Sequence, residues 1–254
     1  MYYIEIDDAG LASPDAAVVV ELLKQKAWEK QKEPTQYFRL RSLQSIRNSE
    51  HSVFEPDAIP VGSLDFAEQI LGTDIQPLNI PDCLRDPSYI SRRMVEATAK
   101  EIPSIFARWH TETLFIKSMT LAKTPYNGLY SKKGLSLLSP VDRYLVSEPL
   151  SFLAEWRCFV YQGKILDIRR YAGSYKIPFL PCDVEFAKDI VKTVDAGLRP
   201  KLEAYTLDLG KTTARDVPVI VELHNFISCG LYGFEDPAIL HMLAAAANRE
   251  RIKN

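Results

Sequence analysis

One stretch near the end of the chain, Val217–Phe226, constrains the fold more than any other part of the sequence. Its second residue is a proline and an apolar run follows, which is typical of a buried strand. Because side chains alternate across a strand, Glu222 and His224 are expected on the same face. A carboxylate and an imidazole together near the end of a buried strand indicate a metal or phosphate site.

A second strand, predicted at 205–209, carries Asp208. A short turn precedes the stretch described above, so the two segments are predicted to pair as a hairpin that brings Asp208 close to Glu222. Two carboxylates suit Mg²⁺ that is held together with substrate phosphates. The alternative interpretation is that these polar side chains only lie in water at the ends of the strands.

The composition is that of an ordinary globular chain. Its 254 residues suffice for one large domain or two small ones, and the net charge of -2 gives no basic field that would favour a nucleic-acid partner. The four cysteines include no CxxC pair, and the N-terminus lacks the order of a signal peptide. No apolar run reaches the roughly 18 residues of a membrane span. We therefore expect a reduced cytoplasmic protein that does not enter a membrane.

The first third of the chain alternates between strand and helix patterns. Strands are predicted at 2–6 and 37–43, and helices at 14–30 and 64–71. Ser63 is a good N-cap for the second of these helices, and Gly72 is a good stop signal. This order predicts a small α/β domain, and three prolines within 77–87 indicate a linker after it.

The rest of the chain mixes helices and strands. Helices are predicted over 88–108, 183–205 and 237–251, strands over 113–118 and 144–148, and a mobile loop over 121–139. Two alternating segments, 154–161 and 164–171, flank Gln162-Gly163, and this spacing is a strong hairpin signal.

Several charged residues lie within these predicted strands. Lys117 follows Leu, Phe and Ile, and is either a solubilising edge residue or a buried cation that awaits an anion. Arg157 shares a face of the hairpin with Glu155, and Arg169 and Arg170 lie on its returning strand. These arginines either form cross-strand salt bridges or capture carboxylates and phosphates. The sequence has no GxxxxGK[ST] or GxGxxG loop, so a nucleotide would need another scaffold.

The charged motifs follow one another in a recognisable order. They are Phe115-Ile116-Lys117-Ser118, a loop with Lys123 and Tyr126-Asn127-Gly128, Val146-Ser147-Glu148, Glu155-Trp156-Arg157, the strand with Asp208, and Glu222-Leu223-His224-Asn225 with a Gly-Leu-Tyr-Gly tail. This order resembles the ATP-grasp superfamily of carboxylate–amine ligases. In detail it is similar to the small bacterial and phage clade named for one arginine and two lysines. The resemblance covers roughly residues 85–235.

The resemblance implies a set of nucleotide-binding residues. They are Lys117, Lys123, Val146, Ser147, Glu148 and Glu155. The two lysines would contact ATP, the second of them from a lid over the phosphates. The backbone of Val146–Glu148 would form the hinge that meets the adenine edge, and Glu155 would approach the ribose or the lid.

The resemblance also implies a metal site with one departure from the family pattern. Asp208 and Glu222 would ligate Mg²⁺, with Mn²⁺ as the alternative ion. The usual third ligand is an asparagine two residues after the glutamate, but here His224 occupies that position and Asn225 follows it. Since Mg²⁺ prefers oxygen ligands, either Asn225 replaces the histidine through a bulge, or His224 ligates, or metal binding is weakened.

The implied fold is an ATP-grasp fold of α/β and α+β class. Residues 1–84 would form a small N-terminal α/β domain, and residues 85–254 two lobes with ATP between them. The implied reaction joins a carboxylate to an amine, as small molecules or a peptide, through an acyl phosphate. Arg157, Lys123 and Arg170 are the candidate catalytic residues, the last as a holder of the substrate carboxylate.

Two other functions remain open from the sequence. A nucleotide-binding regulatory or degenerate module without ligase activity would explain the histidine in the asparagine position. A non-enzymatic interaction protein would use its charged residues only in salt bridges. The oligomeric state and the identity of the substrates are not indicated by any motif.

Overall fold

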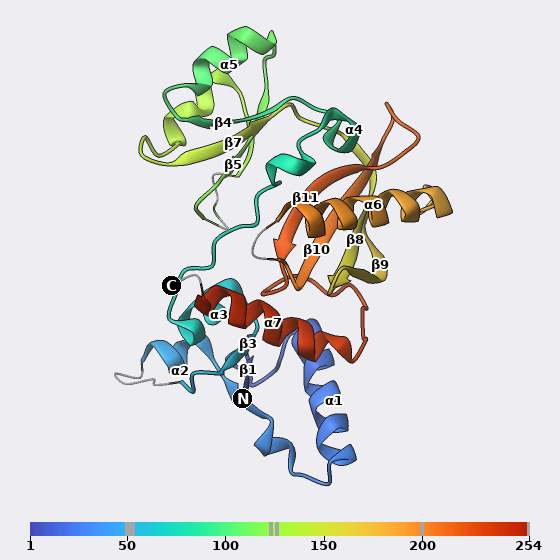
Figure 1. Cartoon of the computed structure of the whole chain (residues 1–254). Helices are drawn as coiled ribbons and strands as arrows, with labels where there is room; N and C mark the ends of the chain where they lie inside the picture. The colour runs from blue at the N-terminus through green and yellow to red at the C-terminus, as the bar shows by residue number, and fades with distance from the viewer. Residues whose placement is uncertain (49–53, 122–123, 125–126, 199–200, 253–254) are drawn as a thin grey trace.

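The computed structural model describes residues 1–48, 54–121, 124, 127–198 and 201–252. In this part of the chain the strands form three sheets, which follow one another along the length of the molecule (Figure 1). We call them the N-terminal sheet (β2-β1-β3), the central sheet (β11-β10-β8-β9) and the upper sheet (β4-β7-β5-β6). Among the described residues, none of the helices has the length and hydrophobicity needed to span a bilayer.

The N-terminal sheet is parallel and carries its helices in the order predicted from the sequence. Its elements are β1 (Tyr2–Glu5), α1 (Pro14–Glu29), η1 (Pro34–Gln36), β2 (Phe38–Arg41), α2 (Leu43–Arg47), β3 (Ile59–Val61) and α3 (Leu64–Leu71). The predicted caps of α3 are confirmed, because the Ser63 side chain accepts a hydrogen bond from the Phe66 amide and Gly72 adopts a left-handed φ of 66°.

The segment after this domain corrects one prediction. The helix expected over 88–108 is interrupted: η2 (Asp82–Leu84) and α4 (Pro87–Ile90) come first, then β4 (Met94–Thr98), and only then α5 (Ile102–Trp109). The middle of the segment becomes a strand because it pairs with β7 along its whole length, a non-local contact that overrides local helical pattern. Pro103 does not break a helix but lies in the first turn of α5.

The upper sheet contains the predicted strand with Lys117. It consists of β4, β5 (Leu114–Ser118), β6 (Gly128–Tyr130) and β7 (Arg143–Ser147), with η3 (Lys132–Leu137) between the last two. The described part of the loop expected over 121–139 therefore includes a strand and a helical turn. β6 was missed because its three residues acquire strand character only by pairing with β5.

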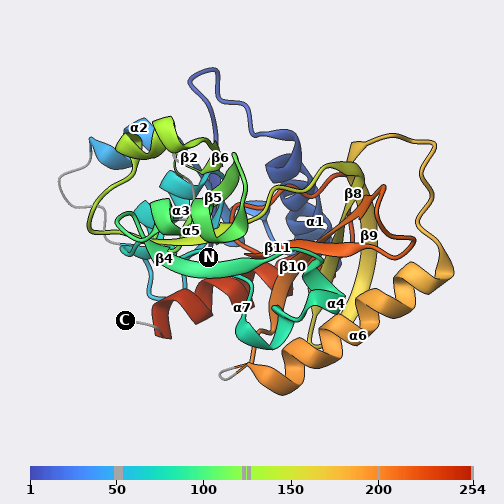
Figure 2. The same cartoon turned by 90° about the horizontal axis from the view of Figure 1, so that it is seen from above.

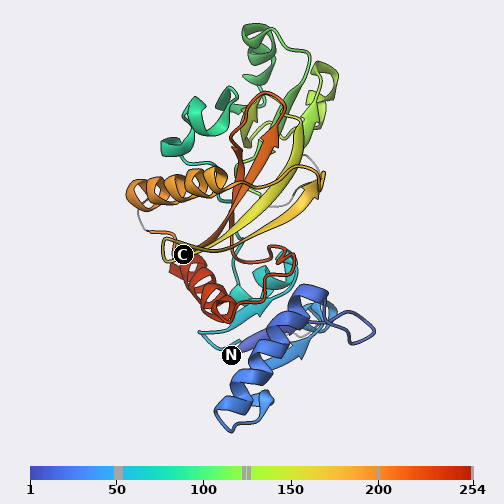
Figure 3. The ribbon, with the colours of Figure 1, turned by 90° about the vertical axis from the view of Figure 1, so that its right-hand side faces the viewer.

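The central sheet is antiparallel and is built from two hairpins. The first joins β8 (Phe152–Tyr161) to β9 (Lys164–Gly173), and the turn residues Gln162 and Gly163 both have positive φ, as the sequence predicts. The second joins β10 (Ala204–Thr212) to β11 (Val219–Asn225), with Asp208 opposite Glu222 and a register shift directly after this pair. Helix α6 (Pro181–Gly197), shorter than predicted, covers one face of the sheet (Figure 3).

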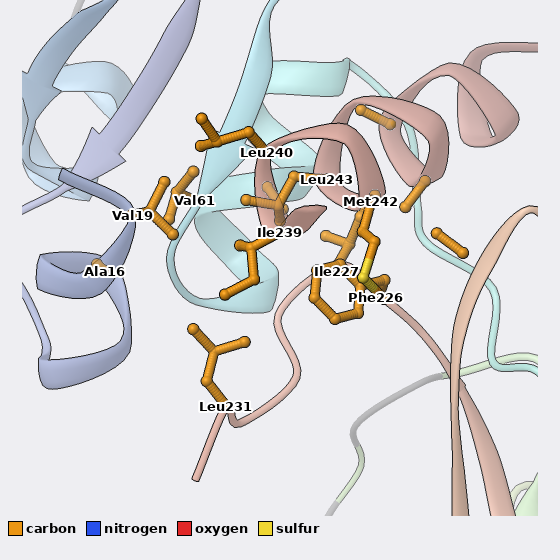
Figure 4. Close-up of a cluster of buried hydrophobic side chains, with 14 of the residues drawn as sticks. Ala16, Val19, Val61, Phe226, Ile227, Leu231, Ile239, Leu240, Met242 and Leu243 are labelled. Atoms are coloured by element: carbon orange, nitrogen blue, oxygen red, sulfur yellow. The ribbon is translucent and has the colours of Figure 1, made fainter. Parts of the chain in front are cut away.

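Helix α7 (Ala238–Ile252) lies between the central sheet and the N-terminal domain (Figures 1 and 3). Its residues Ile239, Leu240, Met242 and Leu243 pack in one core with side chains from α1 and β3 and from the loop after β11 (Figure 4). Seen from above, α4 lies close to β11 at the other end of the sheet, which it contacts (Figure 2). The central sheet is therefore packed against its neighbours at both ends.

Candidate functional site

Three potential metal ligands converge on the face of the central sheet opposite α6. Asp208 of β10 and Glu222 and His224 of β11 offer ligand atoms that all lie within 4.8 Å of one another. The His224 Nε2 atom is 2.7 Å from Glu222 Oε1 and 3.9 Å from Asp208 Oδ2. The hairpin register and strand alternation thus bring together the three side chains that the sequence pattern singled out.

Lys117 reaches this cluster from the upper sheet. Its Nζ donates a hydrogen bond to Glu222 Oε2, so an ion pair joins the two sheets. Burial alone would raise the pKa of Glu222, but the hydrogen bond with His224 and the charge of Lys117 outweigh it and hold this pKa well below its ordinary value. Glu222 is therefore a carboxylate at neutral pH, ready to bind a cation.

Arg157 forms a buried, two-pronged ion pair with Asp208. Its Nε lies 2.8 Å from Asp208 Oδ1 and its Nη2 lies 2.7 Å from Oδ2, while Nη1 donates to the Gly230 carbonyl at 3.2 Å. Burial alone would lower the pKa of Arg157, but the bonds to Asp208 more than compensate and raise it. Charges of alternating sign thus run from Lys117 through Glu222 and His224 to Asp208 and Arg157.

A cavity of about 350 Å³ lies between the two sheets, next to this line of charges. Lys117, Glu155 and Glu222 line it together with an apolar set: Leu78, Ile80, Met94, Phe115, Leu129, Leu145, Leu150 and Phe152. The Glu155 carboxylate accepts a hydrogen bond from the Tyr171 hydroxyl at 2.8 Å. Burial, together with the charges of Asp208 and Glu222, raises the pKa of Glu155.

The segment predicted as the hinge lies at this cavity. Ser147 and Glu148 line the cavity, together with Pro149 and Leu150 that follow them. Val146 is fully buried in the core of the upper sheet, where β7 pairs with strands on both sides, so its side chain belongs to that core. Contact of 146–148 with an adenine stays a prediction, and the lining of the cavity extends the candidate segment to Leu150.

Glu148 has a structural partner that the sequence did not reveal. Its carboxylate accepts hydrogen bonds from the Arg93 backbone N–H at 2.8 Å and from Arg93 Nη2 at 2.6 Å. The bond to this side chain lowers the pKa of Glu148. The carboxylate therefore anchors the end of β7 to the segment before β4.

Arg92 is a second residue that sequence reasoning missed. It lines the cavity and donates from Nη1 to the Ile220 carbonyl at 2.9 Å and from Nη2 to the Val221 carbonyl at 3.1 Å. These carbonyls belong to the irregular part of β11 directly before Glu222, and burial lowers the pKa of Arg92 to about 10. The helix predicted over 88–108 hid this residue, because its role depends on contact with a strand far away in the sequence.

Two arginines of the returning hairpin strand are engaged elsewhere. Both Nη atoms of Arg170 donate to backbone carbonyls, those of Ser174 and Ile177, and its guanidinium lies over the Trp156 and Tyr175 rings. Arg170 therefore fixes the loop after β9, which argues against its predicted role as holder of the substrate carboxylate. Neighbouring Arg169 pairs with Asp167 at 2.6 Å.

Side-chain direction favours His224 over Asn225 as the third metal ligand. Asn225 Nδ2 donates to Glu250 of α7 at 2.6 Å, whereas His224 lies against Glu222 and Asp208. The bulge considered as a way to bring Asn225 into the asparagine position is not present in β11, since the register shift lies before Glu222. Lys123, the predicted lid lysine, lies outside the described residues.

The donors of this cluster fit a divalent cation. Two carboxylates are the ligands that Mg²⁺ and Mn²⁺ favour, and a histidine nitrogen completes the set. The largely buried side chains of Arg157 and Lys117 flank the cluster, so anionic phosphates bound beside the cation would also find counter-charges. Asp208, Glu222 and His224 are thus the residues that would hold the ion.

Comparison with known proteins agrees with this geometry. Residues 89–242 match the model of an ATP-grasp domain family, which is family 2 of the clade named for one arginine and two lysines. None of the curated proteins that were compared matches the chain.

Solved structures of low sequence identity share the fold over nearly all of the chain. D-cycloserine synthetase DcsG has a TM-score of 0.53 at 12% identity, covering 98% of this chain and 99% of that one. D-alanine–D-alanine ligase from Bacillus anthracis has a TM-score of 0.52 at 12% identity, covering 99% and 98%. ATP-grasp ligase PsnB complexed with minimal precursor has a TM-score of 0.50 at 15% identity, covering 96% and 98%. Since the family match spans more than half of the sequence, this protein belongs to that ATP-grasp domain family.

Proposed function

We propose that this protein is an ATP-dependent carboxylate–amine ligase that forms an amide or peptide-like bond. The observation that carries the proposal is the contact of Lys117 with Glu222, which joins the two sheets beside Asp208 and Arg157. Cations for a triphosphate and carboxylates for a metal ion meet there at the edge of a cavity. Such a site suits phosphoryl transfer, in which positioning and charge neutralisation do most of the work.

The cavity between the sheets is the proposed adenine site. Its walls are mostly apolar, as expected for a flat base, and segment 147–150 offers backbone groups for the base edge. Lys117 lines this cavity and also a second one of about 250 Å³ that His224 and Arg157 line. A nucleotide with its base in the first cavity would therefore direct its phosphates past Lys117 toward Arg157.

Asp208, Glu222 and His224 would hold the divalent ion, which supplies charge neutralisation for the phosphates. Lys117 and Arg157 would orient the γ-phosphoryl group toward the substrate carboxylate. A carboxylate oxygen attacks the γ-phosphorus and ADP leaves; the amine nitrogen then attacks the acyl carbon, orthophosphate leaves, and the nitrogen loses its proton to solvent. Burial of these groups between two sheets keeps water away from the acyl phosphate.

A generic amine makes the proposal testable before the natural substrates are known. Hydroxylamine traps acyl phosphates as hydroxamates, so the purified protein is incubated with Mg²⁺, ATP, hydroxylamine and a panel of amino acids and short peptides. The structural neighbours named above motivate this panel. We expect at least one carboxylate to give hydroxamate and ADP in equal amounts.

The Glu222→Gln variant should lose this activity at least about a hundredfold while remaining folded, because it removes a charge that both the metal and Lys117 use. Glu21→Gln, at an exposed glutamate of α1, serves as the matched control. Binding of Mg²⁺-ATP without carboxylate-dependent ADP release across the panel would instead favour a nucleotide-binding module without ligase activity.

A further inference from the structure

Two tyrosines surround the Arg157 guanidinium. Its Cζ lies 5.5 Å from the centre of the Tyr171 ring and 5.3 Å from that of Tyr232, and the two rings stack on each other with centres 5.3 Å apart and planes 24° apart. The three groups form a nearly equilateral triangle. Rings at this distance attract a cation, and the attraction is stronger when the cation is withdrawn from water.

The other contacts of Arg157 leave part of its hydrogen-bonding capacity for a ligand. A guanidinium has five N–H donors. Bonds to Asp208 take two, at Nε and Nη2, and the bond to the Gly230 carbonyl takes one at Nη1. Within the described residues, two N–H groups of Arg157 remain for an anionic oxygen, and the orientation of the guanidinium decides where they point.

The loop that carries Tyr232 is fixed on its opposite side by the N-terminal domain. Leu231 is buried in the core beside Ala16 and Val19 of α1, and its N–H donates to Asp15 Oδ2 at 3.2 Å (Figure 4). With Leu231 held on that side, Tyr232 reaches Arg157 from the other. Its backbone adopts a left-handed φ of 49°, a conformation that is unfavourable for an aromatic residue.

Gly230 makes room for this ring. A Cβ atom at this position would lie 2.9 Å from Cζ of Tyr232, closer than side-chain contacts allow. The same glycine supplies the carbonyl that Arg157 Nη1 uses. One short segment therefore contacts the guanidinium twice, once through a carbonyl and once through a ring.

Tyr171 is anchored from the other strand. Its hydroxyl donates to Glu155, which lines the cavity between the sheets, and burial raises the pKa of Tyr171 so that the hydroxyl keeps its proton. Tyr232, 46% exposed, lines the second cavity together with Lys117 and His224. The pair of rings thus spans the space between the two cavities.

We propose that Tyr171 and Tyr232 are positioning residues that hold the Arg157 guanidinium in one orientation, with its two remaining N–H groups directed at an anionic oxygen of the substrate. The nature of that anion, a phosphoryl or acyl-phosphate oxygen, rests on the proposed function. The positioning itself is a property of the protein alone. It extends to the N-terminal domain, because α1 holds the loop that carries Tyr232.

The first test does not require turnover. The full chain is labelled with ¹⁵N-arginine, and the Arg157 Nε–H resonance is assigned from its absence in Arg157→Lys. Tyr232→Leu and Gly230→Ala should both shift and broaden this resonance, since the first removes the ring and the second displaces it. Tyr232→Phe keeps the ring and should leave the resonance nearly unchanged, as should Trp28→Leu at an exposed aromatic residue of α1. Thermal unfolding shows that each variant is folded, and an unaltered Arg157 resonance in folded Tyr232→Leu overturns the proposal.

The second test separates positioning from a merely structural role. If ADP release from Mg²⁺-ATP is measured, Tyr232→Leu should lower kcat about tenfold and change KM for ATP less than about twofold, with Tyr232→Phe restoring the rate. In the Arg157→Lys background the same substitution should cost less than about twofold, because it acts through Arg157. Independent, multiplying losses in the two variants would contradict the proposal. A wild-type protein that releases no ADP refutes the proposed function, and the Arg157 resonance then decides the positioning by itself.

Discussion

At the level of single side chains, the site consists of charges that each neighbour a charge of opposite sign. Asp208 is the most buried of them, and both of its oxygens face Arg157. A buried ion pair of this kind contributes little net stability, but removal of one partner leaves the other charge uncompensated. The pair is therefore better explained by the chemistry of the site than by the stability of the fold.

Asp208→Asn should lower the free energy of unfolding by about 3–5 kcal/mol, because Arg157 would then be buried without a full counter-charge. Denaturant unfolding followed by circular dichroism measures the change. Asp167→Asn, which breaks the more exposed pair with Arg169, should cost less than about 1 kcal/mol. Equal effects of the two substitutions would show that Arg157 is relaxed or solvated in solution.

His224 should set the metal preference of the site. An imidazole ligand favours transition metals over Mg²⁺ relative to an oxygen ligand. In His224→Asn, we expect the affinity for a nonhydrolysable ATP analogue with Mg²⁺ to rise relative to that with Mn²⁺, by several-fold in the ratio. Calorimetric titration with each metal measures this ratio. If the ratio is the same in both proteins, His224 does not ligate.

The residues that sequence reasoning located share one property. Glu222 and His224 follow from strand alternation, and Asp208 follows from hairpin pairing, both of which are local rules. Arg92, Tyr171 and the true partners of Arg170 depend on contacts between distant segments, which no local pattern encodes. The sequence therefore predicted the cluster of candidate metal ligands but not the groups that orient its surroundings.

Among the elements, the segment between β7 and β8 connects the upper and central sheets. Glu148 at its start binds both the backbone and the side chain of Arg93, directly before β4. Because the hydrogen bond to Arg93 lowers the pKa of Glu148 below its ordinary value of 4.5, folding favours the charged form. The resulting stability is complete above that value and is lost as pH falls through the lower pKa of the folded state.

We therefore expect wild type and Glu148→Gln to differ in free energy of unfolding by a constant amount above about pH 5.5, and this difference to shrink as the pH falls below 4.5. Urea unfolding at a series of pH values measures it. A difference that grows toward low pH would mean that the folded state instead favours the protonated carboxyl group.

The elements were predicted well where pairing is local and poorly where it is not. The β8–β9 hairpin follows from Gln162-Gly163, and α3 follows from its caps at Ser63 and Gly72. β4 was mistaken for helix because only its partner β7 makes it a strand. This error mattered for the site, since the residues directly before β4 are Arg92 and Arg93.

In the whole molecule, ionic and backbone contacts cross between the sheets on both sides of the cavity. Lys117 reaches from the upper to the central sheet, and Arg92 donates to β11 from the segment that leads into the upper sheet. The N-terminal domain approaches from below, where it shares a core with α7 and with the loop after β11 (Figure 4). All three parts of the chain therefore border the candidate site.

The most direct measurement is a crystal structure with Mn²⁺ and a nonhydrolysable ATP analogue, with the metal located by anomalous scattering. We expect a Mn²⁺ peak among Asp208, Glu222 and His224, the adenine in the cavity beside residues 147–150, and phosphate oxygens within hydrogen-bonding distance of Lys117 and Arg157. A nucleotide bound outside the space between the two sheets, or a metal peak away from these three residues, would contradict the proposed function.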